Sequence, residues 1–579
     1  MAAETASLPY HEPDIVTILV QTSFLLLLNI ANSALNRLVY CGLVGQVLIG
    51  IAWGSPGGKW LSTSAEHVVV QLGYFGLILL VYEGGLSTSF TSLRANLLLS
   101  SAVAVTGICL PIALSFSLQG LLGATPLQAF AAGAALCSTS LGTTFTVLAS
   151  SDLSTTRLGV VLTSAAMMDD VVGLVMVQVI SNLGGENFTG LTVVRPILVS
   201  LAFAVCIPLA CRFLLKPGTL ALNHYRKTHP SARFDRLLRH SHTAFVVHTL
   251  LLIGLVAGAT YAGTSNLFSA YIAGAVISWW DSELPHHTAG QLPSGSTIAK
   301  PVPAEKAGTD ERQASDHTAQ APADDVQNAN ITMPRLSDPK DTETPTVLAE
   351  DNCRTSGSAV YEKYYHQAVQ RTLQPFFFAS IGFSIPISRM FSGSIVWRGL
   401  VYAILMTFAK LLCGLWLVRF SLQPARDTVG GVLSRVRVPS VPHFWGKKQP
   451  GTNTETAQTQ ARRTATRNLP ASTSTQTSMS LKPISLQPPL ILALAMVARG
   501  EIGFLISSVA ESKGIFSSSL NDGSESDIFL VVTWAIVLCT IVGPLGVGLC
   551  VRRVRALENK KNQEREGAGR DVLGVWGVR

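Results

Sequence analysis

Two adjacent aspartates, Asp169 and Asp170, lie in the middle of an otherwise uncharged apolar stretch at residues 158–182. A charged side chain at the centre of a bilayer costs about 2.5–3.5 kcal/mol on insertion scales. Two neighbouring carboxylates cost more, because each one disfavours the ionisation of the other. Carboxylate oxygens bind protons and hard cations. The pair therefore indicates a site at which a cation and protons bind.

Further charged residues interrupt other apolar stretches. They are Lys410 in MTFAKLLCGLWLV, Arg499 and Glu501 in LALAMVARGEIGFLISSV, and Glu83 in LILLVYEGGL. Adjacent helix positions point about 100° apart, so the two aspartates cannot face one partner equally well. We expect one aspartate to pair with Lys410, the only lysine inside an apolar stretch, and the other to face a water-filled cavity. A purely structural ion pair would explain Lys410 and one aspartate, but not the second aspartate.

Small polar residues gather in the middle of the apolar stretch at 127–149. They are Ser138, Thr139, Ser140, Gly142, Thr143 and Thr144. A helix that breaks at such a run frees carbonyl and hydroxyl oxygens that can coordinate a cation. The stretch at 488–511 has its own interruption at residues 498–501. Small polar residues also let helices pack closely, but two broken helices in corresponding halves are typical of inverted-repeat transporters.

Apolar stretches long enough to cross a bilayer as helices recur along the chain, and we count about thirteen. They lie at 15–36, 40–54, 66–84, 95–118, 127–149, 156–182, 193–215, 242–262, 265–280, 371–388, 395–420, 488–511 and 527–551. Hydrophobic residues make up 48% of the chain and charged residues 13%. The acidic first residues lack the basic start of a cleavable signal peptide. The sequence predicts an all-α polytopic membrane protein.

Basic residues gather at 216–239, at 426–467 and in the tail from Arg552. With thirteen spans these segments fall on one side of the membrane, which the positive-inside rule makes the cytoplasm. The opposite side then receives the N-terminus and Asn187, whose Asn-Phe-Thr sequon makes it a glycosylation candidate. We expect the N-terminus outside or in a lumen and the C-terminus in the cytoplasm, in a plasma membrane or an endomembrane.

Two long polar segments lack sustained apolar periodicity and are expected to be disordered cytoplasmic insertions. The expected division is an extracytoplasmic N-terminus 1–14, spans 15–281, an insertion 282–365, spans 366–421, a basic insertion 422–487, spans 488–551 and a basic tail 552–579. The isoelectric point near 9.0 reflects basic residues beside the spans, where anionic lipid explains them better than nucleic acid does. The nine cysteines show no metal-ligand spacing, and no cofactor is implied.

Blocks of sequence along the chain follow one order. They are LVGQVLIGIAWG, LGYFGLILLVYEGGL, AMMDDVVGLV, LFSAYIAGAVIS, PFFFASIGFSI, FAKLLCG and ARGEIGFLI. In these blocks the chain resembles the cation:proton antiporter superfamily, the group with the sodium/hydrogen exchanger domain, from about Asn29 to Val551 outside the insertions. The paired acids are of the Asp-Asp type. Long insertions and a sequon suggest a eukaryotic host.

The resemblance implies a role for each matched residue. Asp170 matches the acid that alternately binds cation and proton, and Asp169 the acid that pairs with the span lysine, here Lys410. Thr139 and Ser140 lie at the broken helix beside the site, and Arg499 and Glu501 belong to the opposing broken helix. The implied fold is a six-helix core that moves against a dimerisation domain, in a homodimer. The Glu-Gly-Gly at residues 83–85 matches the other, largely Asn-Asp branch, which leaves the proton stoichiometry open.

The expected function is antiport of a monovalent cation, Na⁺ or K⁺, against protons by alternating access. A carboxyl group in a partly dehydrated cavity retains its proton, and a cation competes for the same oxygens. Entry of the cation would release Asp169 from Lys410, and the desolvated lysine could give up a second proton. Two alternatives stay open: a cation-coupled solute symporter of similar architecture, and an intramembrane aspartyl protease. The protease is less favoured, because its two aspartates would lie on separate helices.

Overall fold

The computed structural model describes residues 12–140, 156–184, 190–228, 240–283, 355–418, 486–517 and 526–564, together with Leu153, Leu573 and Trp576. Every regular element in these ranges is a helix. Eight helices of this part are long and apolar enough to cross a membrane. They are Ile15–Leu38, Thr63–Leu86, Leu97–Leu122, Arg157–Leu183, Val194–Tyr225, Ser241–Ala262, Gly393–Leu417 and Asp527–Leu557. The chain is a multi-pass membrane protein, as the sequence predicts.

The other expected spans contain shorter or interrupted helices, or they continue outside the described residues, so the number thirteen stays a prediction. Helix α2 has 12 residues, α7 has 10 and α18 has 10. The stretch at 488–511 holds two helices, α21 and α22, and the residues between them are not helical. The expected interruption of this span is therefore confirmed.

One group of helices packs around α9, the helix with the two aspartates, and we call it the aspartate bundle. It consists of α5 (Leu97–Ser115), α7 (Pro126–Ala135), α9 (Arg157–Leu183), α20 (Gly393–Leu411), α21 (Gln487–Ala495), α22 (Glu501–Ser512) and α23 (Asp527–Glu564). Its helices come from two parts of the sequence that are separated by more than 200 residues. The neighbouring turns are α4 (Phe90–Ala95), α6 (Leu118–Leu122), α19 (Ile387–Met390) and η3 (Leu412–Leu417).

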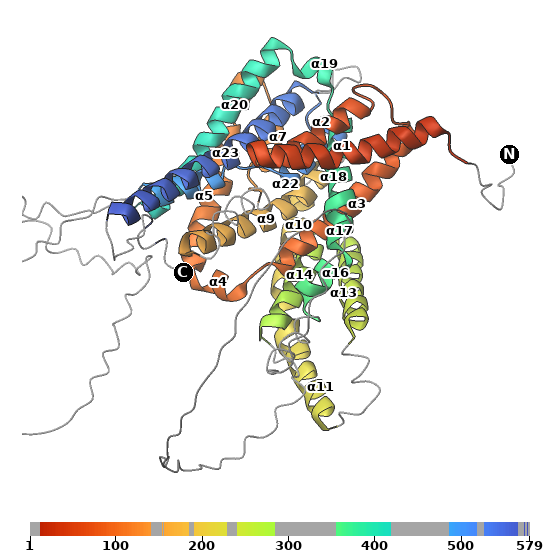
Figure 1. Cartoon of the computed structure of the whole chain (residues 1–579), viewed down its shortest axis with the longest axis vertical. Coiled ribbons are helices and arrows are strands. Elements are labelled where there is room, and N and C mark those ends of the chain that lie inside the picture. Colours follow the sequence, from red (N-terminus) through yellow and green to blue (C-terminus); the bar gives the residue numbers. More distant parts are fainter. Residues whose placement is uncertain are drawn as a thin grey trace, which may run out of the picture.

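A second group, which we call the flanking bundle, lies beside the first. It consists of α1 (Ile15–Val39), α2 (Gly42–Trp53), α3 (Thr63–Leu86), α13 (Ser241–Ala262), α14 (Asn266–Glu283) and α18 (Gln374–Phe383), with the short elements α16 (Gly357–Tyr364), α17 (His366–Ala368) and η2 (Val369–Leu373). Helix α10 (Gly190–Ala210) packs on α9 and α14 and continues through η1 (Cys211–Leu215) into α11 (Lys216–Thr228). Figure 1 shows α11 projecting away from both bundles at the bottom of the view.

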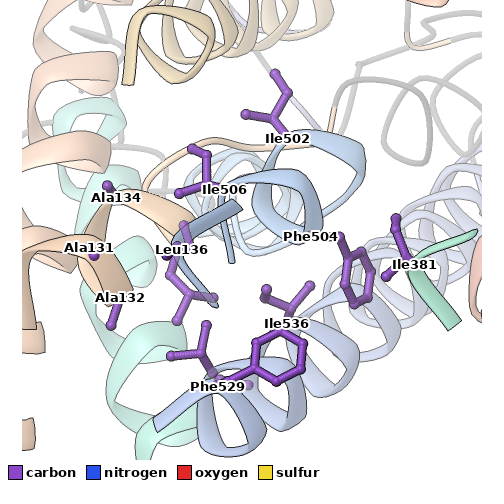
Figure 2. Close-up of a cluster of buried hydrophobic side chains, with 14 of the residues drawn as sticks. Ala131, Ala132, Ala134, Leu136, Ile381, Ile502, Phe504, Ile506, Phe529 and Ile536 are labelled. Atoms are coloured by element: carbon purple, nitrogen blue, oxygen red, sulfur yellow. The ribbon is translucent and has the colours of Figure 1, made fainter. Parts of the chain in front are cut away.

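The interior of the aspartate bundle is closely packed because α7 carries alanines where its neighbours carry large side chains. Ala131, Ala132 and Ala134 are fully buried against α22 and α23. Figure 2 shows these alanines facing a cluster that includes Ile506 and Phe529. Small residues on one helix let bulky residues of the next approach its backbone closely. This packing fixes the end of α7, and with it the polar residues that follow.

Two boundaries differ from those expected. The segment 282–365 was expected to be a disordered insertion, but residues 357–364 form helix α16. Ser356 caps its first turn, and Val360 and Tyr361 are buried against the flanking bundle. Eight residues are too few to show a clear helical period, so tertiary packing decides this helix. The basic segment after residue 215 likewise begins as helix α11 and not as a loop.

Helices α2 and α18 cross at two glycines. A Cβ atom on Gly382 would collide with the carbonyl oxygen of Val47 and lie 2.7 Å from the backbone nitrogen of Ile51. A Cβ atom on Gly50 would collide with the carbonyl oxygen of Ala379. The two backbones can therefore touch only while both positions lack a side chain.

We predict that Gly382→Ala lowers the thermal unfolding midpoint of the purified protein, because overpacking a close helix contact costs about 1–3 kcal/mol. The control is Gly254→Ala on α13, where an added Cβ meets open space. Alanine favours a helix over glycine by about 1 kcal/mol, so the control should be neutral or stabilising. Equal midpoints for the two variants would contradict the crossing.

Candidate ion-binding site

Asp169 and Lys410 form a buried ion pair between α9 and α20. The Lys410 Nζ atom lies 2.7 Å from Asp169 Oδ2, and both side chains are fully buried. Thr139, from the segment after α7, completes the contact: its Oγ1 donates to Asp169 Oδ2 at 2.9 Å and accepts from Lys410 Nζ at 2.9 Å. The second carboxylate oxygen, Asp169 Oδ1, has no hydrogen-bond donor in the described part of the chain. The pairing is the one that the sequence predicted.

The two interrupted helices meet at this pair. Helix α7 ends at Ala135 and α21 at Ala495, and both chains then run in non-helical conformation. The backbone nitrogen of Ser140 donates to the carbonyl oxygen of Ala498 at 3.0 Å, and Thr139 Oγ1 also lies 3.3 Å from the carbonyl oxygen of Met496. The two segments therefore cross in contact, one on each side of the ion pair.

Arg499 satisfies carbonyl groups that the break in α7 leaves exposed. Its side chain is fully buried, and Nη1 donates to the carbonyl oxygens of Ser138 at 2.6 Å and Cys137 at 3.3 Å. The C-terminal end of a helix carries partial negative charge and unpaired carbonyls. The Thr540 hydroxyl in turn donates to the carbonyl oxygen of Arg499 at 2.9 Å. Ser138 thus takes part through its backbone, while its side chain was the expected ligand.

Asp170 faces away from this ion pair and lines a cavity of about 560 Å³ between the two bundles. Glu501, at the first position of α22, lines the same cavity, and the side chain of Ser140 is hydrogen-bonded to its carboxyl group. The charges that act most strongly on Asp170 are those of Glu501, Asp169 and Lys410. The division of the two aspartates between a lysine and a cavity is thus present in the structure.

Glu83, at the end of α3, is a third carboxyl group on this cavity. The Tyr361 hydroxyl donates to Glu83 Oε2 at 3.0 Å, and His366 Nδ1 lies 3.9 Å from Glu83 Oε1. Burial raises the pKa of the Tyr361 phenol, so the phenol keeps its proton and acts as the donor. The helix α16 that follows the first insertion is thereby attached to the cavity wall.

Several amide side chains that line the cavity were missed by the sequence analysis. They are Asn32, Asn36, Gln46, Gln370 and Gln374. The signal was present as polar residues four apart within apolar stretches, since such pairs share one helix face. Two expected residues, Thr143 and Asn187, lie outside the described residues. In the described part, no group of three or more His, Cys, Asp or Glu side chains could hold a metal ion.

Comparison with known proteins bears on the part of the chain that carries the aspartates. Residues 23–298 match the model of the family "Sodium/hydrogen exchanger, transmembrane". This part of the chain belongs to the sodium/hydrogen exchanger family. The family is one of transporters. The matched exchanger segment includes Glu83, Thr139, Asp169 and Asp170, whereas Lys410, Arg499 and Glu501 come after it.

Relatives of the exchanger segment are antiporters by name. The chain is 33% identical over 143 residues to the high-affinity Na⁺/H⁺ antiporter NhaS3 of Synechocystis, covering 24% of this chain and 31% of that protein. It is 29% identical over 170 residues to the Na⁺/H⁺-K⁺ antiporter GerN of Bacillus cereus, covering 29% and 43%. The chain thus spans less than half of these relatives. A structure of the sodium proton antiporter MjNhaP1 from Methanocaldococcus jannaschii aligns with a TM-score of 0.47 at 13% identity, covering 93% of this chain and 96% of that one.

We predict that the Asp169–Lys410 pair stabilises the fold only as a pair. Lys410→Met should lower the free energy of unfolding by about 3–5 kcal/mol, because it leaves a buried carboxylate without its partner. The double variant Asp169→Asn, Lys410→Met should recover most of this loss, since no charge is then buried unpaired. Thermal unfolding in detergent measures both.

The control for this cycle is Lys513→Met, which removes an exposed lysine and should change little. Additive losses in the double variant would mean that the two side chains do not interact in the folded protein.

Proposed function

We propose that the protein exchanges a monovalent cation, Na⁺ or K⁺, for protons across the membrane. The observation that carries the proposal is one polar cavity lined by Asp170 and Glu501 directly beside the buried Asp169–Lys410 pair. The family of residues 23–298 and the printed names of NhaS3 and GerN support the same activity. In this proposal the protein is a transporter and not an enzyme, and it works as a homodimer.

Competition for oxygen atoms couples the two fluxes. Asp170 presents carboxylate oxygens to the cavity, where burial makes an uncompensated negative charge costly. The site is therefore occupied either by a proton or by a cation, and each displaces the other. Glu501 and the Ser140 hydroxyl are within the same lining and would add oxygen ligands of the kind that hard cations prefer.

Lys410 gives the site a way to release a second proton. Its ammonium group is held by Asp169 and Thr139 and has no contact with water, because its side chain is fully buried. A cation beside Asp170 would attract the Asp169 carboxylate and weaken its bond to Lys410. An ammonium group that loses its counter-ion in a desolvated site gives up its proton readily.

Alternating access requires the site to open to one side of the membrane at a time. The cavity is lined by the end of α1, the beginning of α2 and the end of α3, through Asn36, Gly42 and Ser87. The positive-inside rule assigns these helix ends to the cytoplasm. We infer that the cavity opens to the cytoplasm, with the N-terminus outside or luminal. Movement of the aspartate bundle against the flanking bundle would then open the opposite side.

Asp170→Asn should reduce exchange to background, because an amide neither carries the negative charge that balances a cation nor exchanges a proton at this site. The measurement is cation uptake by proteoliposomes driven by a pH gradient, with Na⁺, K⁺ and Li⁺ tested separately. The matched control is Asp527→Asn, since Asp527 is half-exposed and paired with Arg389 at 2.8 Å on the protein surface. An Asp170→Asn protein that exchanges at the wild-type rate would refute the proposal.

Lys410→Ala should make the dependence of exchange on pH shallower, because only the carboxyl proton then competes with the cation. The apparent cation affinity is measured between pH 6 and pH 9 in the same vesicles as for the wild type, a range about the ordinary midpoint of the exchange signal of such groups. Unchanged pH dependence in a folded variant would remove the lysine from the proton path and leave the role of Asp170 intact.

A further inference from the structure

A second cavity, of about 740 Å³, lies on the other side of α9 from the ion-binding site. Its walls are α4, α9, α10 with η1, and α14. Val171 lines this cavity, while its neighbour Asp170 lines the first one. Tyr271 of α14 borders both, and its hydroxyl lies 2.9 Å from Thr88 Oγ1. The proposed ion path does not use this second cavity.

The lining changes character along the two longest walls. On α10 the apolar residues Phe203 and Ile207 come first, and the basic residues Arg212 and Lys216 follow at the end. On α14 the apolar residues come first as well, and Trp279 and Glu283 follow in the last turns. The cavity thus has an apolar inner part and a polar, tryptophan-bearing rim. Such a gradient is the one found between acyl chains and headgroups at a membrane interface.

A turn of π-helix lies where the gradient changes. Residues 211–215 form η1 between α10 and α11. A π-turn inserts an extra residue into a helix and is frequent at functional sites. Here the chain still presents Pro208, Arg212 and Lys216 to one cavity on both sides of the turn. The basic side chains therefore continue the apolar stripe of α10.

The charge of the rim is positive. Arg94, from the end of α4, joins Arg212 and Lys216, and all three side chains are exposed at the surface. Glu283 is the single acidic residue in the lining. Basic residues at the end of a membrane helix often only reach for water. Three of them from two separate elements around one apolar cavity also form a complementary surface for a phosphate that is attached to acyl chains.

We propose that this cavity binds one anionic phospholipid from the membrane leaflet that faces the rim. Its headgroup phosphate lies at Arg212, Lys216 and Arg94, and an acyl chain lies along Phe203 and the apolar face of α14. The volume falls within the roughly 300–1,000 Å³ of ligand pockets. The bound lipid touches α9 at the residue after Asp170, between the two bundles. The proposal does not rest on the transport activity, since its test is binding.

The experiment measures the thermal unfolding midpoint of the purified full-length protein in detergent, because a ligand of the folded state raises this midpoint. The probes are dioleoyl phosphatidic acid, dioleoyl phosphatidylcholine and inorganic phosphate, each titrated separately. We expect a saturable rise with phosphatidic acid alone. A rise of equal size with phosphatidylcholine would mean that the cavity holds bulk lipid, and a rise with inorganic phosphate alone would mean an ion site. Either result overturns the proposal.

Charge variants locate the headgroup. The double variant Arg212→Gln, Lys216→Gln should weaken phosphatidic acid binding about 30-fold, since each basic side chain near the surface contributes about 1 kcal/mol and 1.4 kcal/mol is a factor of ten. The control is Arg37→Gln, because Arg37 ends α1 and does not line the cavity. Equal losses in the two proteins would overturn the assignment.

A matched pair on α10 locates the acyl chain. Ala204 lines the cavity, whereas Ala202 is exposed on the same helix and does not. Ala204→Trp fills the cavity and should abolish the rise in midpoint with phosphatidic acid, while Ala202→Trp should keep it. Both variants carry the same added bulk on an exposed helix surface. If both keep the wild-type rise, the lipid does not enter this cavity.

Discussion

The ion pair between Asp169 and Lys410 is the interaction on which the rest of the site depends. Both charges are out of water, and the cost of removing them is repaid only when the geometry is close and further hydrogen bonds are made. Thr139 supplies those bonds to both partners. The helices α9 and α20 and the segment after α7 are consequently held at one point. Any motion of the aspartate bundle must carry the three together.

The crossing of the two interrupted helices follows from the same shortage of water. A membrane-spanning backbone must satisfy its polar groups internally, and irregular backbone is tolerated only where protein or a cavity covers it. Here Ser140 and Ala498 pair across the crossing, and the buried Arg499 side chain takes the carbonyls of residues 137 and 138. The breaks that make room for an ion are thereby stabilised by each other.

The carboxyl groups that the pair leaves unused define the cavity. Asp170 and Glu501 come from the aspartate bundle and Glu83 from the flanking bundle, so the cavity wall belongs to both bundles. Glu83 is also bonded to Tyr361, which follows the long insertion in the sequence. The second cavity lies on the opposite face of α9. The helix with the aspartates thus has an aqueous side and an apolar side.

The sequence by itself determined the class of membrane protein and the residues of the site, because a charge inside an apolar stretch is costly and stands out. The 100° between helix neighbours also predicted that Asp169 and Asp170 would part. Only the tertiary structure decided that Glu83 shares the cavity, that residues 357–364 are helical, and that a lipid-sized cavity lies behind Val171. These depend on contacts between residues far apart in the chain, and helical periodicity describes one helix at a time.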